Sequence, residues 1–380
     1  PIGIAALAVV TKTLHLRHTR LDHRIDWAGA ALLSTSLVPL LLVAEQGREW
    51  GWGSTNAIIC YVIGVVAAIG FLWQEYRMGE EAILPLAMFR NKTVGVASIA
   101  SVLIGVAMFG GLAALPLYLQ IVKGATPTEA GLLLLPMTLG IMIGSILSGQ
   151  IISRTGRYRV FPIVGSALLT ISLFIFHYVA YDTPLWQTMI VMTMFGVGLG
   201  FNFQPLTLAV QNAVPPQQIG VATSTATFTR QIGGTLGTAV FLSILFSTAS
   251  EKITTALAAA VPTQEFQAAL ADPANAAVAE QFAAAQSGGG AATSVLSDSS
   301  FLTGLDERLA KPFLIGFSEA MDLVFLTGSA VMVLGFLVML MLPNVELRKS
   351  ASYGQRENDG APSDADAAND VDDAAVIAHP

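Results

Sequence analysis

Eight stretches of this chain are apolar over the length of a membrane-spanning helix. A helix needs about 20 mainly apolar residues to cross the hydrocarbon core of a bilayer. Hydrophobic residues make up 53% of the 380 residues and charged residues only 12%, roughly half the charged share of a soluble domain. Most of the chain is therefore expected to lie in lipid. The predicted spans are residues 27–44, 57–73, 94–121, 130–151, 160–180, 185–213, 219–247 and 313–342.

The expected fold class is an all-α integral membrane protein. No segment shows the ten-residue alternation of an outer-membrane barrel. Residues 1–11 begin without Met and read as the end of a further membrane helix, followed by a basic cluster at 12–24. We therefore expect this chain to be the later part of a larger protein and, taken alone, to be unable to transport.

The basic residues predict the orientation. If the segment after Val10 is cytoplasmic and each span reverses direction, 13 of the 19 Lys and Arg residues fall inside and Arg230 falls within a span. Cytoplasmic loops of membrane proteins carry this excess of positive charge. The C-terminus is therefore predicted to be cytoplasmic. The bases that fall outside are Arg48, Lys123, Lys252, Arg308 and Lys311.

Three segments stand apart from the spans. Residues 80–93 mix apolar and charged side chains and predict an amphipathic segment on the inner surface, linking two groups of helices. Residues 250–312 form a long external connection rich in Ala, Gln and Ser, predicted to be partly helical; a tolerated insertion and a substrate-capturing cap are both open. Residues 344–380 carry eight acids and three bases, a pattern typical of a disordered, solvated tail.

The sequence offers few residues that could form a catalytic, metal-binding or cofactor-binding site. Cys60 stands alone, so neither a disulfide nor a thiolate metal site is expected within the chain. His15, His18 and His23 lie among arginines in a basic loop and are interpreted as interfacial. No catalytic set, phosphate loop or metal cluster is discernible, so neither an enzyme nor a cofactor is predicted. The acidic tail gives no support to nucleic-acid binding.

A short cytoplasmic turn between two spans carries the first motif with mechanical content. Its glycines allow a tight reversal, and its arginines offer donors to a neighbouring helix end or carboxylate. The turn resembles the loop signature of the major facilitator superfamily, although Ser153 takes the place of the usual Asp, which puts a gating ion pair there in doubt. The motif residues are Gly149, Arg154, Gly156, Arg157 and Arg159.

Further motifs narrow the resemblance. In order, they read LYLQ at 117–120, EAGL at 129–132, LP at 135–136, GVGLG at 196–200 with Pro205, and RQIGGTLG at 230–237. Together they are similar to the second half of the fourteen-helix drug:proton antiporters of the EmrB/QacA type. The resemblance implies that 27–73 are two extra central helices and 94–343 the C-terminal six-helix bundle. It also implies a monomer whose partners are a small amphipathic substrate, protons and the bilayer of the cell inner membrane.

Arg230 is a candidate functional residue even without the family resemblance. It lies about 16 Å along its span, near the midplane. An unpaired charge there costs at least about 2.5 to 3.5 kcal/mol, so Arg230 must face protein or water. Small residues, including Thr223, Gly233 and Gly237, share its stripe and would let another helix approach closely. Two interpretations stay open: a staple between helices, and a direct part in substrate or proton coupling.

The preceding span is the candidate to face Arg230. Gly200, Gln204, Thr207 and Gln211 recur at helical intervals with Asn202 nearby, in an otherwise apolar helix that Pro205 can kink. This uncharged polar stripe suits a cavity for amphipathic molecules, and interhelical hydrogen bonding is the alternative. The GVGLG run within it lies in a span and is not interpreted as a dinucleotide loop.

Acids are absent from the predicted membrane cores. Glu129, Asp182, Glu319 and Asp322 fall near the outer ends of spans. Proton-coupled export needs a shielded carboxylate that alternates between protonated and ionised forms. Its main carrier is therefore expected upstream of this chain, with Glu319 and Asp322 as secondary candidates. The expected function is proton-coupled efflux of amphipathic or cationic drugs; the alternatives are export of an endogenous metabolite and a non-transporting membrane scaffold.

Overall fold

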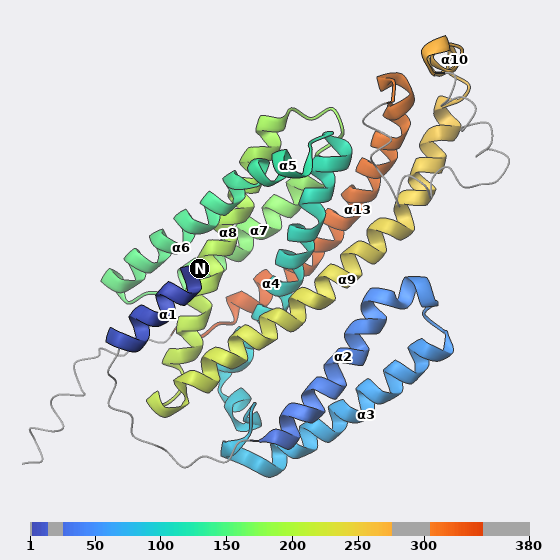
Figure 1. Cartoon of the computed structure of the whole chain (residues 1–380). Helices are drawn as coiled ribbons and strands as arrows, with labels where there is room; N and C mark the ends of the chain where they lie inside the picture. Colours follow the sequence, from blue (N-terminus) through green and yellow to red (C-terminus); the bar gives the residue numbers. More distant parts are fainter. Residues whose placement is uncertain (1, 14–25, 276–304, 345–380) are drawn as a thin grey trace, which may run out of the picture. The chain divides into compact units, whose positions relative to one another are not determined.

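The computed structural model describes residues 2–13, 26–275 and 305–344 (Figure 1). Every regular element within these ranges is helical, as the sequence predicted. The predictions for the 15–23 histidines, the middle of the external connection and the tail beyond residue 344 lie outside the described residues. The chain divides into two compact units, Pro1–Arg90 and Asn91–Pro380.

The first unit contains the two predicted central spans. Its helices are α1 (Ile2–Thr13), α2 (Trp27–Trp50) and α3 (Thr55–Met78), and α2 packs along α3. The Asp26 side chain caps α2 by accepting from the N–H of Gly29. Large apolar side chains of α3 are exposed over most of its length, for example Val66 and Ile69, both 63% exposed. Such a surface is stable in lipid.

The segment that follows α3 does not form one long helix. The amphipathic stretch predicted at 80–93 contains two short 3-10 helices, η1 (Gly79–Glu81) and η2 (Leu86–Arg90). Met88 is buried while Ile83 is 39% exposed. Its predicted place on the inner membrane surface stays a prediction.

The second unit is a bundle of long helices (Figure 1). α8 packs against α6 and α7, α9 packs chiefly against α4 and α13, and α8 also meets α9. The elements are α4 (Lys92–Leu117), η3 (Tyr118–Val122), α5 (Pro127–Leu133), α6 (Leu135–Thr155), α7 (Val160–Phe176), α8 (Leu185–Asn212), η4 (Pro216–Gln218), α9 (Ile219–Ala260), α10 (Gln264–Leu270), η5 (Pro273–Asn275) and α13 (Glu307–Leu340).

All eight predicted spans correspond to apolar helices. Seven helical stretches among the described residues are long and apolar enough to cross a membrane, and α7 follows as a shorter apolar helix of 17 residues. Two spans are interrupted. Thr126 begins α5 with a capping box, and the turn at Leu134 separates it from α6. Proline has no backbone N–H to donate within a helix. Pro116 lies near the end of α4, and the π-helical turn η3 follows it.

Glycines set how closely α6 and α8 approach each other. Gly140 and Gly144 of α6 face the α8 backbone, and Gly196 and Gly200 of α8 face the α6 backbone. A Cβ atom at Gly144 would lie 2.7 Å from the carbonyl oxygen of Val197, too close for any side chain. The GVGLG run therefore forms a helix-packing surface within α8. This confirms the interpretation that the run is part of a span and not a dinucleotide-binding loop.

The small-residue stripe of α9 also allows close helix packing, in this case against a different helix. Gly233 and Gly237 lie directly against the α4 backbone at Val102 and Val106. Small residues at such contacts let two backbones approach without an intervening side chain. The close partner of this stripe is thus α4, whereas the sequence had pointed to α8.

Two helices run well beyond the bilayer. α9 has 42 residues and α13 has 34, which correspond to about 63 Å and about 51 Å. The hydrocarbon core is only about 30 Å thick. The predicted external connection, 250–312, therefore begins and ends as continuations of these helices, and α10 follows α9 after a short turn (Figure 1). The partly helical character predicted for it is confirmed.

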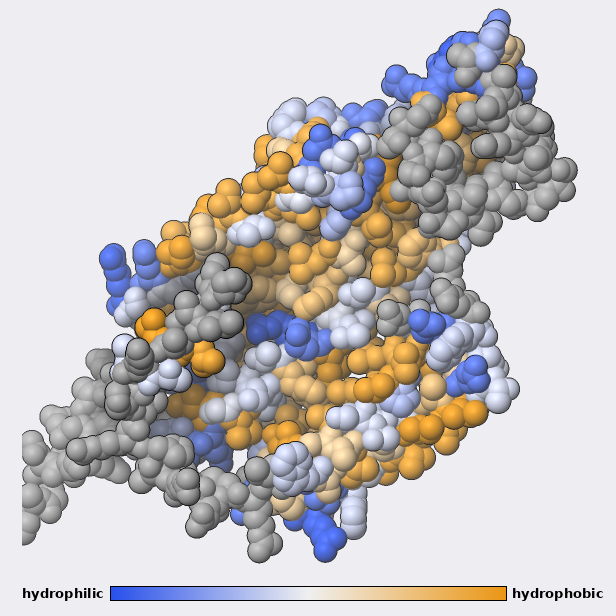
Figure 2. Space-filling model, viewed as in Figure 1, coloured by the Kyte–Doolittle hydropathy of each residue, from blue (hydrophilic) through white to orange (hydrophobic). Residues whose placement is uncertain are grey.

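The surface matches this arrangement. Figure 2 shows hydrophobic side chains over the flank of the bundle and hydrophilic ones around α10. Along α6, Leu139, Met142, Ile143 and Ile146 are each about half exposed on one face. In water such a stripe would be unstable, and in a bilayer it is the lipid-facing side.

Candidate functional site

The polar residues of α8 and α9 meet along the line where these two helices touch. Near the end of α8 that precedes the turn to α9, the amide nitrogen of Gln211 donates a 2.8 Å hydrogen bond to the hydroxyl of Thr223. Two turns further into α9, the guanidinium carbon of Arg230 lies 5.0 Å from the centre of the Phe203 ring on α8. The two contacts tie the helices together while leaving polar groups along their common edge.

The other stripe residues divide between two sides of α8. Gln204 is exposed, and Thr207 is half-buried with its hydroxyl donating to the carbonyl of Phe203. Asn202 lies on the opposite side, fully buried, with its amide nitrogen bonded to the carbonyl of Gly198 and packed against Gly165 of α7. The structure therefore joins Gln211 to α9 and places Asn202 against α7, while Gln204 and Thr207 follow Gln211 at helical intervals along α8.

Arg230 has no counter-charge within its bundle. It is half-buried, and no oxygen atom of the described residues accepts a hydrogen bond from its guanidinium group. The helices α4, α6, α7 and α8 contain no Asp or Glu. The nearest acid along α9 is Glu251, 21 residues and about 31 Å away. The ring of Phe203 is thus the main attraction that the bundle itself offers to this cation.

Phe203 is the residue that sequence reasoning missed. An aromatic side chain in an apolar helix looks like any other lipid or core residue. Its place on the flank of the polar stripe, next to Gln204 and one turn before Thr207, was the available signal. Only the meeting of α8 with α9 makes it a partner of Arg230.

The two secondary proton candidates differ in their surroundings. Glu319 of α13 forms a 3.2 Å ion pair with Lys252 of α9, and both side chains are about half exposed. One carboxylate oxygen of Asp322 is buried without a hydrogen-bond partner among the described residues. The ring of His177 lies 3.1 Å from the backbone carbonyl of Asp322. Asp322 is therefore the better placed of the two to bind a proton.

The motif at the turn between α6 and α7 combines a contact to another helix with a conformational requirement. Gly156 ends α6 with φ of 69°, in the left-handed region that favours glycine. Arg159 donates a 2.9 Å hydrogen bond to the carbonyl of Leu340 at the end of α13, the helix-end contact that the sequence suggested. Arg154 and Arg157 are exposed, and Gly149 lies within α6 rather than in the turn.

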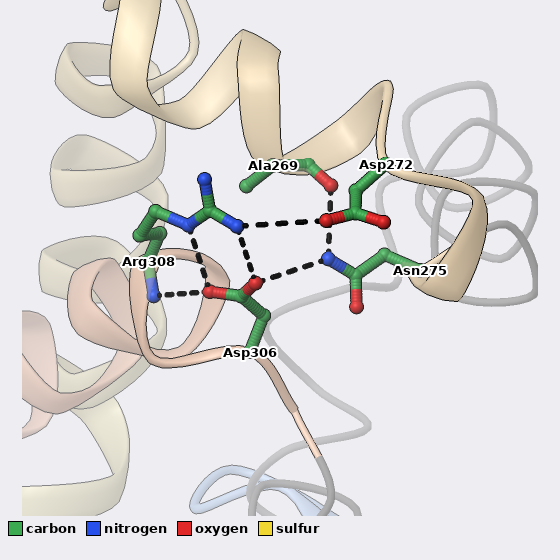
Figure 3. Close-up of polar contacts among 5 residues, drawn as sticks. All are labelled: Ala269, Asp272, Asn275, Asp306 and Arg308. Carbon is green, nitrogen blue, oxygen red and sulfur yellow. Dashed lines mark hydrogen bonds and ion pairs between the residues drawn. The ribbon is translucent and has the colours of Figure 1, made fainter.

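A polar cluster holds the far end of the long helices together (Figure 3). Arg308 donates two hydrogen bonds, of 3.0 and 2.7 Å, to the carboxylate of Asp306 and lies 3.8 Å from Asp272. Asn275 donates to Asp306 and to the carbonyl of Ala269, which joins α13 to α10. These hydrogen bonds, those from Arg308 first, hold the pKa of Asp306 well below its usual range.

Next to this cluster lies a pocket of about 360 Å³ between α9, α10 and α13. Its walls combine alanines of α9 with Phe266, Pro312 and Ile315, and its rim carries charges of both signs, Glu265 and Lys311 among them. Bases and acids are balanced there, so the rim selects no particular charge.

The first unit contains two buried acids, Asp26 and Glu75. Asp26 accepts a 3.0 Å hydrogen bond from Gln74, and Glu75 accepts a 2.8 Å bond from the backbone of Leu84. One oxygen of each carboxylate is buried without a partner among the described residues. These bonds tie the ends of α2 and α3 to the segment that follows. In the described part of the chain, no three His, Cys, Asp or Glu residues are grouped to hold a metal ion.

Comparison with known proteins gives a consistent result. The sequence pattern of the Major Facilitator Superfamily matches residues 27–238. A tetracycline resistance determinant of Streptomyces rimosus is 37% identical over 325 residues, covering 85% of this chain and 92% of that protein. An uncharacterized MFS-type transporter of Mycobacterium tuberculosis is 30% identical over 91% of this chain, and multidrug resistance protein 3 of Bacillus subtilis is 31% identical over 60% of it.

The last two alignments cover 46% and 44% of the respective relatives, so this chain corresponds to about half of their length. Most of the helices long enough to span a membrane lie within the matched residues 27–238, and α13 lies beyond them. The polar edge of α8 and α9, set in an otherwise apolar bundle, is consistent with passage of a solute rather than with a chemical reaction. The chain belongs to the Major Facilitator Superfamily and is a multi-pass membrane transporter.

Proposed function

We propose that this protein exports amphipathic or cationic drugs from the cell in exchange for protons. The observation that carries the proposal is the polar edge of α8 and α9, where Gln211 is hydrogen-bonded to Thr223 and Arg230 lies against Phe203. Gln204 and Thr207 continue this edge along α8 at helical intervals from Gln211. An uncharged polar wall with aromatic neighbours accommodates varied amphipathic molecules, because it requires few obligatory hydrogen bonds.

The names of the relatives support the drug class. One is described as a tetracycline resistance determinant and another as a multidrug resistance protein. Transport would follow alternating access, in which two helix bundles rock around a central site. In that scheme residues 94–343 supply one bundle, and α2 and α3 are two additional helices of a fourteen-helix transporter. The protein would act as a monomer in the bacterial inner membrane with its C-terminus in the cytoplasm.

Proton coupling requires a carboxylate that this bundle does not place at mid-depth. Its helices α4, α6, α7 and α8 have none. We assign the main proton carrier to a part of the transporter outside this bundle and a secondary role to Asp322, whose carboxylate oxygen is buried without a partner in the described structure. Glu319 is less suited, because Lys252 already pairs with it.

Drug accumulation in cells tests the proposal. Cells that lack their own efflux pumps and express the whole natural protein should accumulate several-fold less of an amphipathic dye than vector controls. A protonophore should remove the difference within minutes, because the exchange depends on the proton gradient. Equal accumulation with and without the protein, at confirmed membrane expression, would reject drug export; reduced accumulation that resists the protonophore would reject proton coupling.

A further inference from the structure

Arg230 and Phe203 together present an unusual surface at mid-depth of the bundle. Arg230 is half-buried on α9, and its guanidinium carbon lies 5.0 Å from the centre of the Phe203 ring on α8. A ring offers its π-electrons to the cation but no oxygen to the N–H groups. The five guanidinium donors therefore remain without an oxygen acceptor among the described residues.

A cationic side chain without an oxygen acceptor is uncommon at membrane depth. Charged side chains at membrane depth pair with one another, with backbone carbonyls or with a bound ion. Among the described residues of this bundle, no acid lies near Arg230. The helices α4, α6, α7 and α8 have none, and Glu251 is about 31 Å along α9. On α13, Glu319 pairs with Lys252, about 33 Å along α9 from Arg230, and Asp322 lies one turn from Glu319. A negative partner for Arg230 would therefore come from outside the bundle.

The surroundings of Arg230 indicate what form that charge takes. The guanidinium group is planar and fits a carboxylate through two parallel hydrogen bonds. Phe203 adds an apolar face beside the cation, and Gln204, the next residue of α8, is exposed with an amide that can donate or accept. A planar aromatic acid has matching features: a negative oxygen group attached to a flat apolar ring.

We propose that Arg230 and Phe203 form a subsite for an acidic oxygen group of the transported molecule, a carboxylate or an ionised enol or phenol. The inference rests on the proposed drug export and restricts its preferred substrates to amphipathic compounds with an acidic group. Anionic and zwitterionic compounds then bind better than the purely cationic drugs that the broader proposal includes. A purely cationic compound would meet Arg230 as a like charge, and the subsite discriminates against it.

Two dyes that differ only at the acid provide the test. Tetramethylrhodamine has a free carboxylate and is a zwitterion near neutral pH, whereas its methyl ester has the same chromophore and a single positive charge. Binding of each dye to the whole natural protein in lipid nanodiscs is measured by fluorescence anisotropy. The protein should bind the acid more tightly than the ester.

Substitution of Arg230 then assigns the preference. Arg230→Gln should weaken binding of the acid by about 10-fold or more and change binding of the ester by less than about twofold, because only the acid loses a charge-assisted pair. Arg230→Lys keeps the charge but loses the planar fork. It should bind the acid with an affinity between those of the wild type and Arg230→Gln. Lys311→Gln, an exposed lysine on the outer part of α13, serves as the control and should match the wild type.

The outcomes separate this inference from the proposed function. Equal weakening of both dyes in Arg230→Gln would overturn it, because Arg230 would then pair with a carboxylate of the protein or staple helices. A wild-type preference for the ester would overturn it as well. Thermal melting confirms that each variant is folded, and Arg230→Lys carries the test if Arg230→Gln is not. If the acid is preferred through Arg230 but neither dye is exported, the subsite stands and drug export fails.

Discussion

Single residues of α8 show where sequence reasoning succeeds. Helical spacing predicted that Gln204, Thr207 and Gln211 share a side of α8, and the structure joins Gln211 to Thr223 of α9. Asn202 was grouped with them because it is polar and close in sequence. Two residues along a helix correspond to about 200°, so Asn202 faces α7 instead. Phe203 could not be recognised before the neighbour of α8 was known.

Gln204 and Asn202 should therefore differ when each is replaced by alanine. Gln204→Ala should change the relative export of different drugs, with little effect on the melting temperature, because the side chain is exposed on the polar edge. Asn202→Ala should lower stability by about 1 kcal/mol, through loss of the bond to Gly198 and of packing against Gly165, with an unchanged drug profile. Drug susceptibility and thermal melting of both variants check this. The reverse pattern would place Asn202 in the substrate path.

At the scale of elements, hydropathy located every span but not the helix ends outside the membrane. The external connection predicted from residue 250 was expected to be partly helical, but its composition did not show that residues 250–260 continue α9 without a break. Hydropathy reports contact with lipid, whereas helix length depends on partners, and here α13 packs along α9. Likewise, the glycines of α6 and α8 were visible in the sequence, but their pairing required the packed helices.

The α6–α8 contact should be intolerant of any added side chain. Gly140→Ala and Gly196→Ala each direct a Cβ atom into the backbone of the facing helix and should destabilise the bundle by about 1 to 3 kcal/mol. Gly131→Ala is the matched control, because a Cβ at that position meets nothing within 4 Å. Thermal melting in detergent measures the difference. If all three variants melt alike, the two helices are not in backbone contact.

Acid should loosen the outer ends of α9 and α13 before the bundle itself. The pKa of Asp306 is depressed in the folded protein, so its contribution to stability is present above the unfolded value of about 3.9 and declines as pH falls below it. The hydrogen-exchange protection factors of residues 264–275 and 305–309, the ratios of intrinsic to observed rate at the same pH, should fall between about pH 4 and pH 3. Asp306→Asn should have lower protection factors already at pH 6, and pH-independent protection in the wild type would contradict this account of the cluster in Figure 3.

For the whole molecule, the distribution of basic residues predicts the orientation in the membrane. If the cytoplasm contains the turn at Arg154 and Arg157, then α10 and the ends of α9 and α13 lie outside the cell. A cysteine introduced at Gln267 of α10 should react with an impermeant maleimide added to intact cells, and one at Ser153 should react only after lysis. Both positions are exposed. For this experiment Cys60 is replaced by Ser, and labelling of Ser153→Cys in intact cells would invert the topology.

The central claim is that the α8–α9 edge transports drugs in exchange for protons, and transport by the purified protein tests it most directly. The whole natural protein and Arg230→Lys are reconstituted into liposomes at equal amounts of folded protein, and uptake of an amphipathic drug is followed after the lumen is made acidic. We expect uptake that requires the proton gradient in the wild type and at least about a tenfold lower rate in Arg230→Lys, since the lysine lacks the planar fork. Equal uptake by the two proteins, or uptake independent of the gradient, would contradict the account.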